Sequence, residues 1–208
     1  HEPVALDAAL ELIMVTGDRL HRHDEAETWA RQSEALLAHV GPDDPAWRVL
    51  SNVRGIVHHN AGRLEAAEQE YRRSLAQAEA AGRPLSAAGT LNNLGGLLHD
   101  QGRFAAGRVE LDASIAIYER ELGPDHPLLI EPLLNLAMLA VAERDLDTAE
   151  RHATRARAIL ERAFGPDSPR LVQPLRLLGD IHLGRGEEAV AASLYEQVLA
   201  RMDPELAS

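Results

Sequence analysis

The chain has 208 residues, of which 45% are hydrophobic and only 3% aromatic, and its formal net charge at pH 7 is −12. The hydrophobic content excludes a disordered chain, and the scarcity of aromatic residues favours helices over a β-sandwich. The negative charge argues against nucleic acid as a partner, the absence of cysteine excludes disulfides and thiolate metal sites, and no apolar run is long enough to cross a membrane. All 21 basic residues are arginine, which indicates codon bias in a GC-rich, bacterial genome.

A small residue recurs along the sequence at steps of 40 to 42 residues. It lies at Ala26, Ala67, Gly107, Ala149 and Ala191. A fixed period of this size indicates a solenoid of identical supersecondary units. We expect one array over residues 1–208, with repeats at 5–45, 46–84, 85–127, 128–169 and 170–208. Because the chain starts at His1 without Met and stops soon after Pro204, we expect it to be a piece of a longer protein.

Each repeat has the pattern of two amphipathic helices joined by a short turn. In the third repeat Leu91, Leu94 and Leu98 share one helical face. Gly-Pro-Asp turns separate most repeats, but Ala81-Gly82-Arg83-Pro84 separates the second from the third, so we expect that joint to differ in angle or mobility. The sequence predicts an all-α fold with ten helices, at 5–20, 24–40, 46–60, 64–81, 85–100, 104–122, 128–143, 146–164, 170–184 and 187–202.

Three motifs of the third repeat carry a family resemblance: Leu91-Asn92-Asn93-Leu94-Gly95, Gly102-Arg103-Phe104 and Tyr118-Glu119-Arg120, followed by Gly-Pro-Asp-His-Pro at 123–127. They resemble the tetratricopeptide repeats of kinesin light chain and its bacterial relatives, well in repeats two to five and weakly in repeat one. The resemblance implies a right-handed superhelix whose first helices line a concave groove for peptides or partner segments. It implies a cytoplasmic protein-interaction module within a larger signalling protein, with no enzymatic activity and no cofactor.

Small residues of the first helices are expected where neighbouring helices approach closely: Gly55, Gly95, Ala137 and Gly179. Three positions depart from the pattern. Arg54 replaces a leucine, Met14 replaces the small residue of repeat one, and Gly107 lies inside a helix that it could weaken.

Candidate binding residues are those on first helices that point away from both the partner helix and the next repeat. In repeat one these are Glu11, Asp18 and Arg19. In repeats two to five they are Asn52, His59, Asn60, Asn92, Asn93, His99, Asp100, Glu131, Asn135, Arg176 and Asp180. The resemblance implies that Asn93 and Asn135 bond the backbone of a ligand, since an amide offers both donor and acceptor; the alternative is that these asparagines link repeat to repeat.

Acidic residues outnumber basic ones in this set, which favours a partner with net positive charge. The alternative is that the face only shares the acidity of the whole chain. His59 and His99 are equivalent in successive repeats and should lie near each other, whereas His58 and His182 should face the core.

Two other functions compete with peptide binding. One is self-association or an intramolecular regulatory role, for a protein that is a monomer or a weak homo-oligomer. The other, a metal-dependent enzyme built on histidines and aspartates of the groove, is disfavoured because no His-Glu-x-x-His or other catalytic pattern is present.

Overall fold

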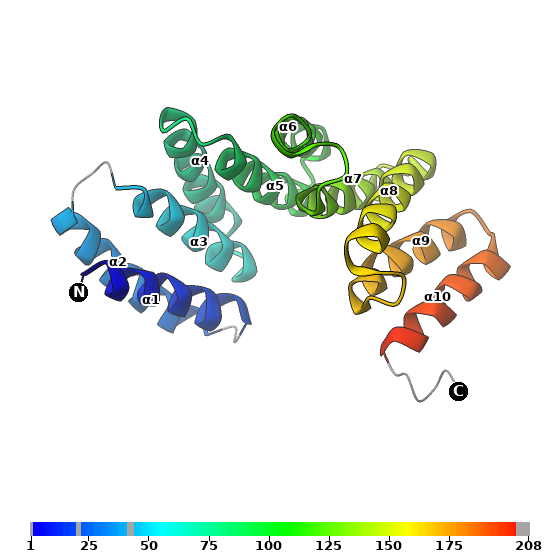
Figure 1. The fold of residues 1–208 in the computed structure, drawn as a ribbon, viewed down its shortest axis with the longest axis horizontal. Helices are drawn as coiled ribbons and strands as arrows, with labels where there is room; N and C mark the ends of the chain where they lie inside the picture. The colour runs from blue at the N-terminus through cyan, green and yellow to red at the C-terminus, as the bar shows by residue number, and fades with distance from the viewer. Residues whose placement is uncertain (1, 20–21, 41–43, 203–208) are drawn as a thin grey trace. The chain divides into compact units, whose positions relative to one another are not determined.

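The computed structural model describes residues 2–19, 22–40 and 44–202, except for the side chains of residues 2–7, 18–19 and 40. These residues form ten α-helices and no strand, which confirms the predicted all-α fold (Figure 1). The chain divides into two compact units, residues 1–102 and 103–208.

The first unit contains helices α1 to α5, and each packs against the next along the sequence. The first helices also contact one another, α1 against α3 and α3 against α5. Their bounds are α1 Glu2–Met14, α2 His23–Val40, α3 Ala46–Asn60, α4 Leu64–Ala80 and α5 Pro84–Asp100.

The second unit contains helices α6 to α10, again with each helix packed against the next. A short 3-10 helix precedes α7 and another precedes α9, because His126 and Ser168 cap the backbone just before Pro127 and Pro169. The bounds are α6 Phe104–Leu122, 3-10 helix Pro127–Leu129, α7 Ile130–Ala142, α8 Leu146–Phe164, 3-10 helix Pro169–Leu171, α9 Val172–Gly184 and α10 Glu188–Met202. The α-helices predicted to begin at residues 128 and 170 therefore begin two residues later, at Ile130 and Val172.

Helix α1 also differs from the prediction of a continuous α-helix over 5–20. The α-helix ends at Met14 and a π-helical turn follows at Val15–Arg19. Within this turn the hydroxyl of Thr16 donates to the carbonyl of Leu12 at 2.6 Å. A Cβ on Gly17 would lie 2.4 Å from Val57, so Gly17, and not position 14, is the small residue at which repeat one approaches repeat two.

The small residues expected at close helix contacts do lie there in repeats two and five. A Cβ on Gly55 would lie 2.5 Å from the ring of Tyr71, and a Cβ on Gly179 would lie 2.6 Å from the ring of Tyr195. On the second helices Ala67, Ala149 and Ala191 are fully or almost fully buried. Gly107 does not interrupt α6, which runs unbroken from Phe104 to Leu122.

The turn inside each of repeats two to five needs a residue with positive φ. Gly62, Gly102 and Gly186 supply it, with φ of 72°, 71° and 78°. In repeat four Arg144 takes the same position with φ of 64°. A non-glycine residue pays a steric cost in this conformation, so the turn geometry is imposed by the helix packing around it.

Candidate functional site

Two of the predicted asparagines meet across neighbouring repeats of unit 1. Asn52 lies on α3 and Asn93 on α5, and the amide of Asn93 donates to Oδ1 of Asn52 at 3.2 Å. Both side chains are half-buried. This bond is the repeat-to-repeat link that the sequence left open as an alternative. It uses one of two donors on Asn93 and part of the acceptor capacity of Asn52, and no further hydrogen bond of either amide is found among the described residues.

Two of the predicted histidines share one carboxylate near the other end of the same helices. His59 Nε2 lies 2.9 Å from Asp100 Oδ2, and His99 Nδ1 lies 2.9 Å from Asp100 Oδ1. The ring of His59 also packs edge-on against Tyr71, with ring centroids 6.4 Å apart. Partial burial acts to raise the pKa of Asp100, but the hydrogen bonds from His99 and His59 outweigh it and bring the pKa below its ordinary value of 3.8. Asp100 is therefore ionised at neutral pH.

We call this set of side chains the Asn–His face: Asn52, His59, Asn93, His99 and Asp100. The other residues predicted in unit 1 surround it or lie apart. Asn60 is exposed at the end of α3 and Asn92 is half-buried on α5, and each has an interaction partner. Glu11 is exposed on α1, whereas the side chains of Asp18 and Arg19 lie outside the described residues.

In unit 2 two of the predicted residues, Arg176 and Asp180, lie together. Arg176 lies 3.4 Å from Oδ2 of Asp180, and the hydroxyl of Tyr195 donates to Oδ1 of Asp180 at 2.8 Å. This hydrogen bond raises the pKa of Tyr195, because the phenol proton is held by the carboxylate. Glu131 is exposed in the first turn of α7, and Asn135 is half-buried on the same helix and has a partner. Sequence reasoning missed Tyr195, although its place four residues after Ala191 repeats that of Tyr71 after Ala67.

His58 and His182, which were expected to face the core, are each partly buried and hydrogen-bonded. Both are half-buried and contact the residue five positions later, where the second helix of the repeat begins. Arg63 donates to Nδ1 of His58 at 2.9 Å, and His182 Nδ1 lies 2.5 Å from Glu187. A buried imidazole needs a hydrogen-bond partner, and in both repeats the residue five positions later, in the turn, supplies it.

The environment of His58 predicts how the free energy of unfolding depends on pH. Burial and the charge of Arg63 lower the pKa of His58 below its ordinary value of 6.5; Glu27 opposes this effect and Arg54 adds to it. The unfolded state then binds a proton that the folded state does not, so the free energy of unfolding should fall as the pH drops through 6.5. His152, whose pKa is lowered by burial and by Arg151, acts in the same direction. Asp100 adds a further loss below about pH 4.

Urea denaturation between pH 8 and pH 5 measures this loss. We expect His58→Gln, which keeps a neutral acceptor for Arg63, to show a smaller loss of stability on acidification than the unmodified protein. An equal loss in both proteins would contradict this role for His58.

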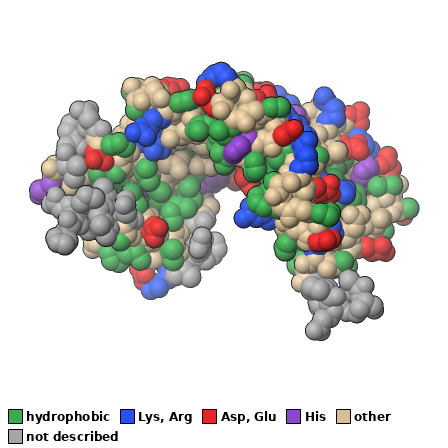
Figure 2. Space-filling model, viewed as in Figure 1, with side chains coloured by type: hydrophobic (Ala, Val, Ile, Leu, Met, Phe, Trp, Pro, Cys, Tyr) green, Lys and Arg blue, Asp and Glu red, His purple; other side chains and the backbone are tan. Residues whose placement is uncertain are grey.

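Among the described residues no three histidine, aspartate or glutamate side chains are grouped so as to hold a metal ion. None of the helices there is long and apolar enough to cross a membrane. Figure 2 shows acidic and arginine side chains interspersed on the visible face of each unit.

A family model for the tetratricopeptide repeat matches residues 86–162 and 130–203, which together make up more than half of the sequence. The chain belongs to the tetratricopeptide repeat family. Its repeats have the form of a helix hairpin, and such repeats generally mediate protein–protein interaction and are typically non-enzymatic scaffolds. No curated protein matched the sequence in the comparison.

Solved structures with the same fold include two of kinesin light chain type. The chain is similar to BtubC (BKLC) from P. vanneervenii, with a TM-score of 0.81 and 20% identity over 97% of this chain and 83% of that one. It is also similar to a putative kinesin light chain with nearly identical TPR-like repeats from P. anserina, with a TM-score of 0.77 and 18% identity over 100% and 99% of the two chains. The apo form of RapI gives a TM-score of 0.72 at 14% identity, over 95% of this chain and 54% of that one. At these identities the likeness concerns the fold, which is that of the tetratricopeptide repeats of the kinesin-light-chain-like structures.

Proposed function

We propose that this tetratricopeptide repeat protein binds an extended peptide or partner segment along its first helices, with the Asn–His face of unit 1 as the main contact. The Asn52–Asn93 pair carries the proposal. Its one internal bond orients both amides and leaves donors on Asn52 and acceptor capacity on Asn93. A peptide group offers one N–H and one C=O, so a preformed amide pair can bond a backbone of loosely specified sequence.

The charge of the Asn–His face favours a partner that places one cationic side chain there. With histidine neutral, Asp100 is the only charged member of the Asn–His face. Two imidazoles hold its carboxylate in place, so a cationic side chain meets a pre-oriented acceptor. In unit 2 we propose that Glu131, Asn135, Arg176 and Asp180 serve the same partner. We further propose that the array is the scaffold or regulatory part of a larger signalling protein, without a nucleic-acid ligand.

A selection from a random-peptide display library tests the proposal. The best peptides would be measured by calorimetry against the unmodified protein and against Asn52→Ala/Asn93→Ala. Two lost hydrogen bonds at about 1 kcal/mol each predict affinity roughly 30-fold weaker.

The matched control is Gln32→Ala/Gln69→Ala, which removes two exposed amides from the second helices α2 and α4. We expect the control to bind as the unmodified protein does. Equal affinity of all three proteins, or the failure of any peptide to be enriched, would count against binding at the Asn–His face.

A further inference from the structure

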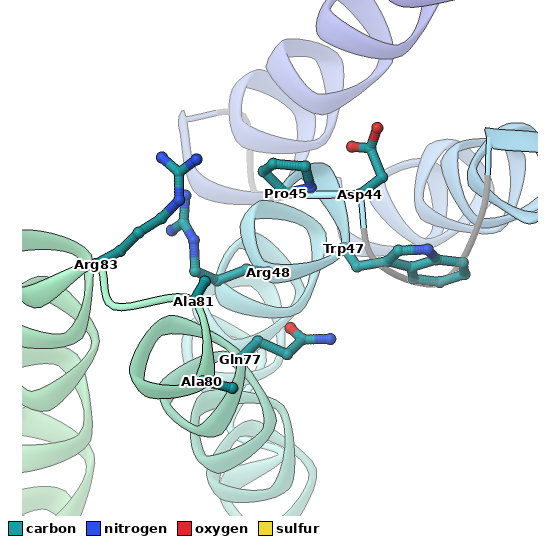
Figure 3. A pocket seen from close by; sticks show the side chains of 8 residues that line it. All are labelled: Asp44, Pro45, Trp47, Arg48, Gln77, Ala80, Ala81 and Arg83. Atoms are coloured by element: carbon teal, nitrogen blue, oxygen red, sulfur yellow. The ribbon is translucent and has the colours of Figure 1, made fainter.

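A cavity of about 430 Å³ opens at the joint between the second and third repeats, where the usual Gly-Pro-Asp turn is replaced. Its lining comes from two helices of unit 1 and the segments next to them. The start of α3 gives Trp47 and Arg48, the end of α4 gives Gln77 and Ala80, and the turn before α5 gives Arg83 (Figure 3). Arg48 lies 11 residues before His59 on α3, or about 16 Å along the helix, so the cavity is separate from the His59–Asp100 cluster.

Arg48 and Arg83 form no hydrogen bond or ion pair through their side chains within the described part of the protein. Every other arginine of unit 1 whose side chain is described contacts a carboxylate or an aromatic ring; these are Arg22, Arg31, Arg54, Arg63, Arg72 and Arg73. Figure 3 shows the two unpaired guanidinium groups next to each other at one side of the cavity. Burial lowers the pKa of Arg48, and the nearby charge of Arg83 lowers it further.

Two polar atoms at the cavity are buried without any partner. They are a donor, Nε of Arg48, and an acceptor, Oε1 of Gln77. Asp44, the only carboxylate of the lining, does not pair with either arginine, because it accepts the backbone N–H of Ala46 at 2.8 Å. Leaving buried polar atoms unpaired costs free energy that a bound ligand would recover.

The repeats themselves show that these polar residues are not needed for the fold. Arg48 lies 19 residues before Ala67, and the residues 19 before the other anchors of repeats three to five are Ala88, Ile130 and Val172. Gln77 lies ten residues after Ala67, and the equivalent residues of repeats one, three and four are Leu36, Ile117 and Ile159. The two exceptions are Asp7 at the first position in repeat one and Arg201 at the second position in repeat five. Because an apolar side chain fills each position in three other repeats, packing alone does not require arginine and glutamine in repeat two.

We propose that this cavity binds a carboxylate of a protein partner together with a neighbouring N–H. The carboxylate would accept from Arg48 and Arg83, since a guanidinium matches a carboxylate with two parallel hydrogen bonds. The N–H would donate to Oε1 of Gln77, and Trp47, Ala80 and Ala81 would contact the adjoining apolar group. Both a free C-terminus and an acidic side chain beside its backbone amide carry this combination. A polyanion such as nucleic acid is disfavoured by the net charge of −12.

The Nε–H resonance of Arg48 in a ¹H–¹⁵N correlation spectrum reports on the site directly, and its absence from the spectrum of Arg48→Ile assigns it. Three pools of random tetrapeptides would be titrated: one with free C-termini and no acidic residue, one amidated with a single Asp or Glu, and one amidated with neither. We expect at least one of the first two pools to shift this resonance and the third to leave it unchanged. The pool that acts identifies the source of the carboxylate.

Variants make the test specific. Arg48→Ile copies Ile130 and should stay folded with a raised melting temperature, while binding of the active pool weakens about 10- to 100-fold. Arg83→Ala should weaken it similarly. Arg72→Ala removes the same charge from the exposed Arg72–Glu68 pair on α4 and should bind normally. Asn52→Ala/Asn93→Ala should also bind normally, which separates this site from the Asn–His face.

Three outcomes would overturn the proposal. One is that no pool shifts the resonance. Another is that inorganic phosphate or acetate shifts it as strongly as the peptides do at equal concentration. The third is that Arg72→Ala weakens binding as much as Arg48→Ile, since the effect would then follow net charge alone.

Discussion

Gly55→Ala is expected to lower the free energy of unfolding by about 2 kcal/mol, although the same substitution inside a helix normally raises it by roughly 0.5–1 kcal/mol. The reason is the close contact with α4. The new methyl group would lie 2.5 Å from the ring of Tyr71, and Tyr71 is only 1% exposed. Overpacking of this kind forces shifts in side chains and backbone. Thermal melting should show a drop of roughly 4–8 °C.

The fourth repeat provides the compensating change for Gly55→Ala. At the equivalent positions it has Ala137 and Ala153, a pair of small residues in place of glycine and tyrosine. In a background that already contains Tyr71→Ala, we therefore expect Gly55→Ala to be neutral or stabilising, which gives a coupling energy of about 2 kcal/mol in the double-mutant cycle. Gly184→Ala is the control, because a Cβ there would lie 3.4 Å from Leu146, an ordinary contact. Additive effects of the two substitutions would show that the ring contact is not the cause.

Arg54→Leu is expected to destabilise the protein by about 1–2 kcal/mol, even though a leucine or isoleucine occupies the same position in the other repeats. Arg54 lies 3.3 Å from Glu34 and 3.6 Å from Glu70. The side chain of Glu70 is only 16% exposed, and its Oε2 is buried without a hydrogen bond. Removing the guanidinium leaves this carboxylate poorly solvated and without a cation. Urea denaturation measures the change.

The double substitution Arg54→Leu/Glu70→Leu should recover the stability that the single change loses. It copies the fifth repeat, which has Leu178 and Leu194 at these two positions. Replacing a partly buried ion pair by apolar residues of similar size is often neutral or stabilising. Arg31→Ala, which breaks an exposed pair with Glu27 at 3.9 Å, should change stability by less than about 0.5 kcal/mol. If the double variant were no more stable than Arg54→Leu, the loss would come from missing arginine packing and not from the stranded carboxylate.

The candidate site could be predicted only in part from the sequence, and the particular residues show why. The equivalence of His59 and His99 predicted that they would lie close, and both do contact Asp100. The same reasoning placed His58 and His182 against the core but did not foresee that each of these partly buried rings bonds a residue of the following turn. Periodicity gives the helical face of a residue, but a long polar side chain such as Arg63 or Glu187 reaches its partner through rotamers that periodicity does not describe.

The polar residues at the cavity beside Arg48 stand out in the sequence, but only the structure shows what they do. An alignment of the repeats places Arg48 and Gln77 at positions that are each apolar in three of the other four repeats. Alone, this comparison would allow a salt bridge to Asp44, which lies four residues before Arg48. The structure shows that Asp44 caps the start of α3 instead, so the arginine stays unpaired.

By itself the sequence determined the ten helices, the repeat length, the family and the small residues at close contacts, because each of these depends on local spacing and on the volume of one side chain. The tertiary structure alone decided which polar groups bond one another: Asn93 with Asn52, His59 and His99 with Asp100, and neither Arg48 nor Arg83 with any described acceptor. Hydrogen bonds and ion pairs depend on distances of a few tenths of an ångström between residues up to 41 positions apart. Such distances follow from how the helices pack and not from the order of residues within any one of them.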